Sequence, residues 1–283
     1  MKTSKNAEKR SVCPVCFHHC SLAEGQYGRC RARKNENGTI VSANYGKITA
    51  LMLDPIEKKP FRRFYPGSKI LSVGSFGCNL ACPFCQNYDI SMAKDEQIDH
   101  KEILPDELVQ LAVQYQSYGS IGVAFTYNEP LVGYEYVRDT AKLIKKYGMK
   151  NVLVTNGTAE LAVLEELLPY MDAMNIDLKG FTEEYYQMAG GDFKTVQRFI
   201  ERAVRECHVE LTTLIIPDEN DSIEEMKKEA SWIASLDETI PLHITRFFPR
   251  YRMTDRKPTD IAAIYELRAV AGRYLRWVYT GNC

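Results

Sequence analysis

Short runs of hydrophobic residues alternate with longer amphipathic stretches over most of the chain. Each run is rich in Val, Ile, Leu, Phe or Thr, a composition typical of strands buried on both faces of a parallel sheet. Six buried strands are predicted in this way, and a short final strand is predicted at 275–279. The six are residues 69–76, 120–126, 150–155, 173–178, 208–216 and 241–248.

The stretches between these runs carry helix signals. Residues 105–119 begin with Pro105 and two acids and stop at a glycine, while 133–148 ends in two lysines and a glycine. Ser222 and Glu225 form a capping box that predicts a helix reaching about residue 237. Alternating strands and helices predict an α/β fold with a parallel sheet and right-handed crossovers.

Six strand–helix units, fewer than the eight of a closed barrel, predict a partial (β/α)6 TIM-type barrel. Residues 1 to about 60 break the alternation. We therefore expect two parts: a small cysteine-rich N-terminal appendage at 1–60 and the barrel at 61–283.

Composition and charge narrow the class of protein. The 283 residues are 45% hydrophobic and 26% charged, which is ordinary for a globular protein with a sizeable core. The net charge is −1 and the two signs are interleaved, so no basic footprint for nucleic acid is present. The N-terminus lacks an apolar run and the longest apolar stretches are too short to cross a bilayer. We expect no membrane or nucleic-acid partner and a cytoplasmic location.

Nine cysteines are unusual for a protein of a reducing compartment, where disulfides are rare. Four lie within residues 13–30 and three within 78–85. Clustered thiols of this kind indicate metal ligands, and two clusters indicate two sites. Cys207 is interpreted as a buried small hydrophobic residue. Cys283 is interpreted as either an exposed thiol or an extra ligand.

Polar residues follow several predicted strands. The cysteine triplet comes directly after strand 69–76, and the segments TYNEP (126–130), TNG (155–157), DLK (177–179) and HITR (243–246) stand at other strand ends. In a parallel barrel these ends meet at one rim, where reactive groups collect. The sequence therefore predicts one site built from several loops.

The triplet Cys78-x3-Cys82-x2-Cys85, with Phe84 before the third cysteine, resembles the cluster loop of the radical S-adenosylmethionine (SAM) superfamily. Within it, the chain is most similar to glycyl-radical-enzyme activases of the pyruvate formate-lyase activating type, and in particular to the radical enzyme of the AmmeMemoRadiSam system. The similarity also includes the strand-end segments above, HITRFFPRY and the terminal VYTGN.

This resemblance implies an oxidoreductase in which three thiolates hold a [4Fe–4S] cluster and the fourth iron is left for S-adenosylmethionine. Reductive cleavage then gives a 5′-deoxyadenosyl radical that abstracts a substrate hydrogen. The implied partners are a flavodoxin- or ferredoxin-type electron donor and either a glycyl-radical enzyme or a Memo/AMMECR-type protein. Two alternatives are radical modification of a small molecule or protein side chain in a Memo-associated pathway, and a non-catalytic iron–sulfur or zinc scaffold, with His100 completing a zinc site.

The resemblance also assigns residues by position. Lys179 joins the three cysteines in the catalytic group, and the DLK lysine of the family neutralises the cofactor carboxylate or substrate. Expected contacts to S-adenosylmethionine are Phe84, Asn128, Glu129, Thr155, Asn156, Gly157, Asp177, Lys179, His243 and Arg246. The alternatives are a simple turn at TNG, a solvated Asp177–Lys179 pair and a structural histidine at 243. Val154 stands where the pyruvate formate-lyase type has an aspartate that helps to bind a monovalent cation, so the resemblance does not extend to that cation ligand.

The first cysteine cluster is Cys13-x2-Cys16-x3-Cys20-x9-Cys30. A structural zinc ion suits four thiols and would order a segment with little core of its own, and it is the preferred assignment. An auxiliary [4Fe–4S] cluster suits the same count and could relay electrons. His18 or His19 could replace one cysteine. The ferredoxin-like insertion of many activases is absent between Cys85 and strand 120–126.

Overall fold

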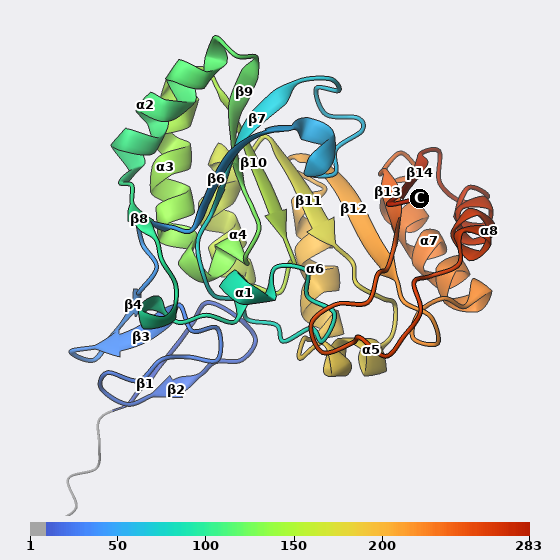
Figure 1. Cartoon of the computed structure of the whole chain (residues 1–283), viewed down its shortest axis with the longest axis horizontal. Helices are drawn as coiled ribbons and strands as arrows, with labels where there is room; N and C mark the ends of the chain where they lie inside the picture. Colours follow the sequence, from blue (N-terminus) through green and yellow to red (C-terminus); the bar gives the residue numbers. More distant parts are fainter. Residues whose placement is uncertain (1–9) are drawn as a thin grey trace, which may run out of the picture.

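The computed structural model describes residues 10–283 and contains one large sheet with helices around it (Figure 1). Among these residues no helix has both the length and the apolar character needed to cross a membrane. The eight strands of the sheet are β6 (Ala50–Pro55), β7 (Lys69–Gly74), β9 (Ser120–Phe125), β10 (Lys150–Thr155), β11 (Ala173–Asp177), β12 (His208–Ile215), β13 (Leu242–Arg246) and β14 (Val278–Gly281). They stand side by side in chain order, from β6 at one edge to β14 at the other.

The pairing pattern confirms the predicted partial barrel. From β7 to β14 every neighbouring pair is parallel, and the two edge strands do not pair with each other. The six predicted buried strands all form, each ending at the predicted limit or one to two residues before it. The final strand forms at Val278–Gly281, slightly later than expected.

The principal helices are α2 (Pro105–Gln116), α3 (Tyr134–Lys146), α4 (Leu161–Leu167), α5 (Glu183–Met188), α6 (Phe193–Ala203), α7 (Ile223–Asp237) and α8 (Ile261–Ala271). Ser222 caps α7 by accepting from the Glu225 backbone N–H, which is one half of the predicted capping box; the Glu225 carboxylate instead accepts from the Phe181 N–H. Apolar residues of these helices, for example Leu108, Val137, Phe199 and Ile233, are fully or almost fully buried in one core with the sheet. The burial of each such side chain stabilises the folded state by roughly 1.5–3 kcal/mol.

One strand of the sheet was not expected. β6 pairs antiparallel with β7 over its whole length, from Ala50 opposite Gly74 to Pro55 opposite Lys69. The predicted appendage of residues 1–60 therefore includes a strand of the main sheet. Its sequence ALMLDP contains a buried aspartate and ends in proline, neither of which is typical of a strand, so the sequence pattern did not predict one. Proline is nevertheless tolerated on an edge strand.

The remaining described elements are short. They are β1 (Ser11–Val12), β2 (Ser21–Leu22), β3 (Arg33–Glu36), β4 (Thr39–Ser42), β5 (Lys47–Ile48), β8 (Lys101–Glu102), α1 (Tyr88–Ser91) and the 3-10 turns η1 (Ile56–Lys58), η2 (Asp95–Gln97), η3 (Pro130–Gly133) and η4 (Leu168–Tyr170). β1–β2 and β3–β4 form two small antiparallel hairpins. Figure 1 shows these hairpins next to α1, at the end of the sheet where the strand-end loops gather.

Candidate functional site

A cavity of about 290 Å³ lies at the carboxyl ends of the parallel strands. Its walls come from the loop after β7 and from the ends of β9, β10, β11, β12 and β13. The structure brings ten of the thirteen predicted site residues of the barrel to this cavity. They are Cys78, Cys82, Phe84, Cys85, Asn128, Glu129, Thr155, Asn156, Asp177 and Lys179.

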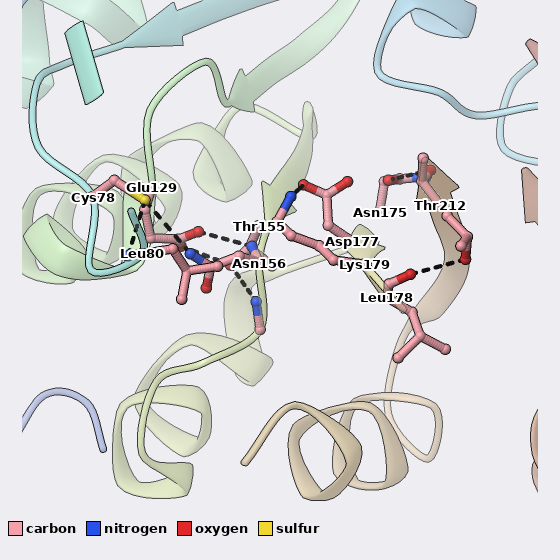
Figure 2. Close-up of polar contacts among 12 residues, drawn as sticks. Cys78, Leu80, Glu129, Thr155, Asn156, Asn175, Asp177, Leu178, Lys179 and Thr212 are labelled. Carbon is pink, nitrogen blue, oxygen red and sulfur yellow. Dashed lines mark hydrogen bonds and ion pairs between the residues drawn. The ribbon is translucent and has the colours of Figure 1, made fainter. Parts of the chain in front are cut away.

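The three cysteines stand on the loop that follows β7. Cys82 is buried, whereas Cys78 and Cys85 are partly exposed toward the cavity. The Leu80 N–H donates to the Cys78 sulfur at 3.4 Å and the Asn156 amide donates to it at 3.7 Å (Figure 2). N–H groups aimed at cysteine sulfur are the contacts that stabilise thiolates of iron–sulfur sites. The surroundings of Cys78 therefore fit a cluster ligand.

Two of the thiols, those of Cys78 and Cys82, are held protonated by their environment. Burial raises the pKa of Cys82 to about 11, and burial together with Glu129 raises the pKa of Cys78. A metal must displace these protons when it binds. Among residues 10–283, no three Cys, His, Asp or Glu side chains already stand around one common ion position. A four-iron cluster does not require that arrangement, because its cysteines bind separate irons.

Glu129 and the TNG segment are bonded to each other. The Glu129 carboxylate accepts from the Thr155 hydroxyl at 2.7 Å, the Asn156 N–H at 2.8 Å and the Leu131 N–H at 3.0 Å. Burial raises the pKa of Glu129 to about 7. This network joins the ends of β9 and β10 and turns the Asn156 side chain toward Cys78 (Figure 2).

The Asn128 side chain is also fully used within the protein. Its Oδ1 accepts from the Ser75 N–H at 3.0 Å, and its Nδ2 donates to the carbonyls of Phe76 and Gly77 at 3.1 Å each. Asn128 therefore fixes the start of the cysteine loop. The expected side-chain contact with S-adenosylmethionine would require it to give up these bonds.

Tyr127, the residue before Asn128, has a backbone φ of +74°, which is a genuine outlier for a bulky residue. The Asn128 N–H donates to the Thr126 carbonyl across Tyr127, which closes a strained γ-turn. The Tyr127 hydroxyl donates to Asp54 of β6 at 2.7 Å, and Lys59 lies 4.3 Å from the ring centroid. Strand β6 thus holds the turn that shapes one wall of the cavity.

Asp177 and Lys179 form an ion pair at 2.9 Å beside the cavity (Figure 2). Burial acts to lower the pKa of Lys179, but Asp177 and the nearby Cys82 outweigh it and raise the pKa well above its ordinary value. Lys179 is therefore a fixed positive charge next to a cysteine of the triplet. It is suited to bind a carboxylate.

Three predicted contacts are not brought to the cavity. His243 lies near the start of β13 rather than at its end, and its Nε2 is 2.6 Å from Glu210. Arg246 lies one position after Thr245, which lines the cavity, so the alternation along the strand turns Arg246 away, and it donates to the Thr259 carbonyl. Gly157 forms a left-handed turn, and a Cβ there would lie 2.9 Å from Ile176.

The alternative zinc ligand His100 is likewise outside the cavity lining and lies 3.8 Å from Asp95. Several lining residues were missed by the sequence reasoning: Gln86, Asn87, Ser91, Thr126, Tyr127, Thr212, Thr245 and Asn282 are examples. Thr126, Thr245 and Asn282 belong to the quoted segments TYNEP, HITR and VYTGN. The signal was present, and strand alternation within HITR would have selected Thr245 over its neighbours.

Comparison with known proteins agrees with this architecture. Residues 72–230 match the family model of the Radical SAM superfamily. An uncharacterised protein of Methanocaldococcus jannaschii is 38% identical over 273 residues, covering 95% of this chain and 80% of that protein. The pyruvate formate-lyase-activating enzyme of Clostridium pasteurianum is 28% identical over 210 residues, covering 71% of this chain and 87% of the enzyme.

Solved structures share the fold. Streptococcus suis SuiB bound to S-adenosylmethionine aligns with a TM-score of 0.61 at 14% identity, over 76% of this chain and 52% of SuiB. QueE from Escherichia coli aligns with a TM-score of 0.52 at 12% identity, over 83% of this chain and 92% of QueE.

Proposed function

Because the chain belongs to the radical SAM superfamily, we propose that Cys78, Cys82 and Cys85 hold a [4Fe–4S] cluster and that the adjoining cavity binds S-adenosylmethionine. The observation that carries this proposal is the opening of three cysteines onto one cavity that also presents Lys179. Among residues 10–283 no fourth cysteine lines that cavity. Three thiolates leave one iron of a cubane without a protein ligand, which suits the binding of a cofactor.

When bound, these groups would supply a one-electron reductive cleavage of S-adenosylmethionine into methionine and a 5′-deoxyadenosyl group, and the latter takes the hydrogen atom from the substrate. The chain's own residues orient and shield this chemistry. Lys179 offers a positive charge for the methionine carboxylate, and Asp177 holds the ammonium group of Lys179 in place. Asn156 and the Leu80 N–H stabilise the Cys78 thiolate, and Glu129 fixes the loop that carries Asn156. Leu80, Phe84 and Phe247 exclude water behind the cysteine loop.

We further propose that the substrate is the glycine Cα–H of a partner enzyme, with an external flavodoxin- or ferredoxin-type protein as electron donor. The support is the similarity to activating enzymes, which include pyruvate formate-lyase-activating enzymes and the 4-hydroxyphenylacetate decarboxylase activating enzyme of Clostridium scatologenes. Homolysis of that C–H bond would leave the unpaired electron on the glycine and move the hydrogen atom to the cofactor-derived product.

The first test is anaerobic reconstitution followed by reduction with dithionite. Wild type should release methionine and 5′-deoxyadenosine, and Cys82→Ala should release neither. Cys207→Ala is the matched control, because Cys207 is a half-buried thiol outside the cavity lining. Normal cleavage by Cys82→Ala would overturn the cluster assignment.

The substrate class needs a second experiment. A peptide that has the sequence of the glycine loop of a glycyl-radical enzyme, with that glycine deuterated at Cα, should transfer deuterium to 5′-deoxyadenosine. The same peptide with alanine in place of that glycine is the control. Turnover without any deuterium transfer from the glycine peptide would count against activase function and leave the cluster assignment intact.

A further inference from the structure

Four cysteines outside the cavity, Cys13, Cys16, Cys20 and Cys30, are neighbours of one another in the N-terminal region. The Cys13 N–H donates to the Cys20 carbonyl at 3.0 Å, which closes the loop of the first hairpin. A Cβ placed on Gly28 would lie 3.7 Å from the sulfurs of both Cys20 and Cys30. Cys13, Cys16 and Cys30 are buried, and all the described cysteines are free thiols.

Arg33 lies beside this group and has one hydrogen-bond donor without a partner. Its side chain is a neighbour of Cys13 and Cys30 and is only 4% exposed. Its two terminal nitrogens are bonded, Nη1 to both oxygens of Glu135 at 2.6–2.7 Å and Nη2 to the Ile40 carbonyl. Its Nε is buried without a hydrogen-bond partner. Such an orphaned donor is costly, and a nearby thiolate sulfur would satisfy it.

The same cysteines touch the loop of the first site. The Cys30 carbonyl accepts from the Cys78 N–H at 3.1 Å, and it approaches Gly77 so closely that a Cβ there would lie 2.5 Å away. His18, between Cys16 and Cys20, lies with Nε2 2.8 Å from the Asn79 carbonyl. The Asn79 side chain in turn accepts from Asn156, which contacts the Cys78 sulfur. The segments that carry the two groups of thiols are therefore in direct contact.

We propose that Cys13, Cys16, Cys20 and Cys30 form a second metal centre, bound as thiolates, whose negative charge Arg33 offsets and whose occupancy fixes the loop around Cys78. Four soft thiolates select zinc or an iron–sulfur cluster. As at the first site, the sulfurs do not yet surround one ion position within the described residues, so metal binding draws them inward. Zinc makes the centre a brace, since it has no redox chemistry; iron makes it also an electron carrier next to Cys78.

Metal analysis of the anaerobically purified full chain tests the site. Wild type should contain about one zinc, or about four irons, more than the double variant Cys16→Ser/Cys20→Ser. Cys207→Ser is the control and should match wild type. Equal metal content in wild type and the double variant overturns the proposal. Cys82→Ala, measured in parallel, removes the irons of the first site, so failure of either assignment is recognised separately.

The role of Arg33 is tested by the rate of metal loss to a chelator, EDTA for zinc or bathophenanthroline for iron. Arg33→Gln should lose the second-site metal roughly tenfold faster, because a charge-assisted hydrogen bond to sulfur is removed. Two controls isolate the charge: Lys34→Gln changes a neighbouring cation paired with Glu36, and Glu135→Gln breaks the ion pair but keeps the guanidinium. Equal acceleration in Arg33→Gln and Glu135→Gln overturns this role.

Discussion

Replacing Glu210 by glutamine should destabilise the protein in a pH-dependent manner. Glu210 is a completely buried carboxylate of β12. It accepts from the backbone N–H groups of Arg62 and Arg63 at 2.8–3.1 Å and lies 3.0 Å from His208 and 2.6 Å from His243. These contacts attach the segment after β6 to the amino-terminal end of the barrel, away from the cavity.

The magnitude follows from the charge. Burial alone would raise the pKa of Glu210, but hydrogen bonds from His208, His243 and the two backbone groups lower it from 4.5 to about 2. With about 1.4 kcal/mol for each pKa unit, the ionised carboxylate contributes about 3 kcal/mol of stability. Because the folded-state pKa is lowered, this contribution is complete above pH 4.5 and is lost as the pH falls toward 2.

Anaerobic thermal unfolding of wild type and Glu210→Gln, at pH 7 and in steps down to pH 3, measures the effect. At pH 7 the variant should melt roughly 6–12 °C lower, given about 2–4 °C per kcal/mol for a protein of this size. The gap should narrow as the pH falls below 4.5. Equal melting temperatures at pH 7, or a gap that stays constant with pH, would refute the reasoning. Glu210→Ala should lose more, because two buried N–H groups are left unpaired.

Three shorter predictions concern Lys179, Tyr127 and Glu229. Lys179→Ala should weaken S-adenosylmethionine binding about tenfold or more in calorimetry while iron content stays at the wild-type level. Tyr127→Phe, which removes the hydroxyl bonded to Asp54, should perturb the reduced cluster's EPR response to S-adenosylmethionine; an unchanged response would show that the turn does not depend on that bond. Burial raises the pKa of Glu229 to about 8. The stability that its protonated form contributes is therefore lost as the pH rises from 4.5 to 8. In urea unfolding, the free energy of unfolding of Glu229→Gln relative to wild type should rise by about 4 kcal/mol between pH 5 and pH 8.

The barrel was predictable because the central parallel strands, β7 and β9 to β12, are buried on both faces and leave short apolar runs that periodicity detects. The site was predictable to the level of loops, since strand ends converge. The hydrogen-bond partners of individual side chains were not predictable. Asn128 stands in the right segment but bonds to the cysteine loop, and His243 stands in the right strand but at its other end.

Strand β6 was hidden for a related reason. Its pairing with β7 and the contact of Asp54 with Tyr127 join residues about 20 and 73 positions apart, and no local pattern reports such pairings. The convergence of the N-terminal cysteines on the loop of Cys78 is equally non-local. Spacing indicated that these thiols bind a metal, but only the fold places them against the first site.

The order of strands in the main sheet has a consequence for biosynthesis. Each strand from β6 to β14 lies next to the strand that precedes it in that sheet along the chain. A nascent chain can therefore add one strand and its helix at a time to an edge that already exists, without waiting for a distant partner, which keeps exposed edges short-lived and limits aggregation during translation. The loop of Cys78 follows the second strand and is in place early, whereas Thr245 and Asn282 come from the last two strands. The cavity wall is thus completed only after the loop that carries the three cysteines has been synthesised.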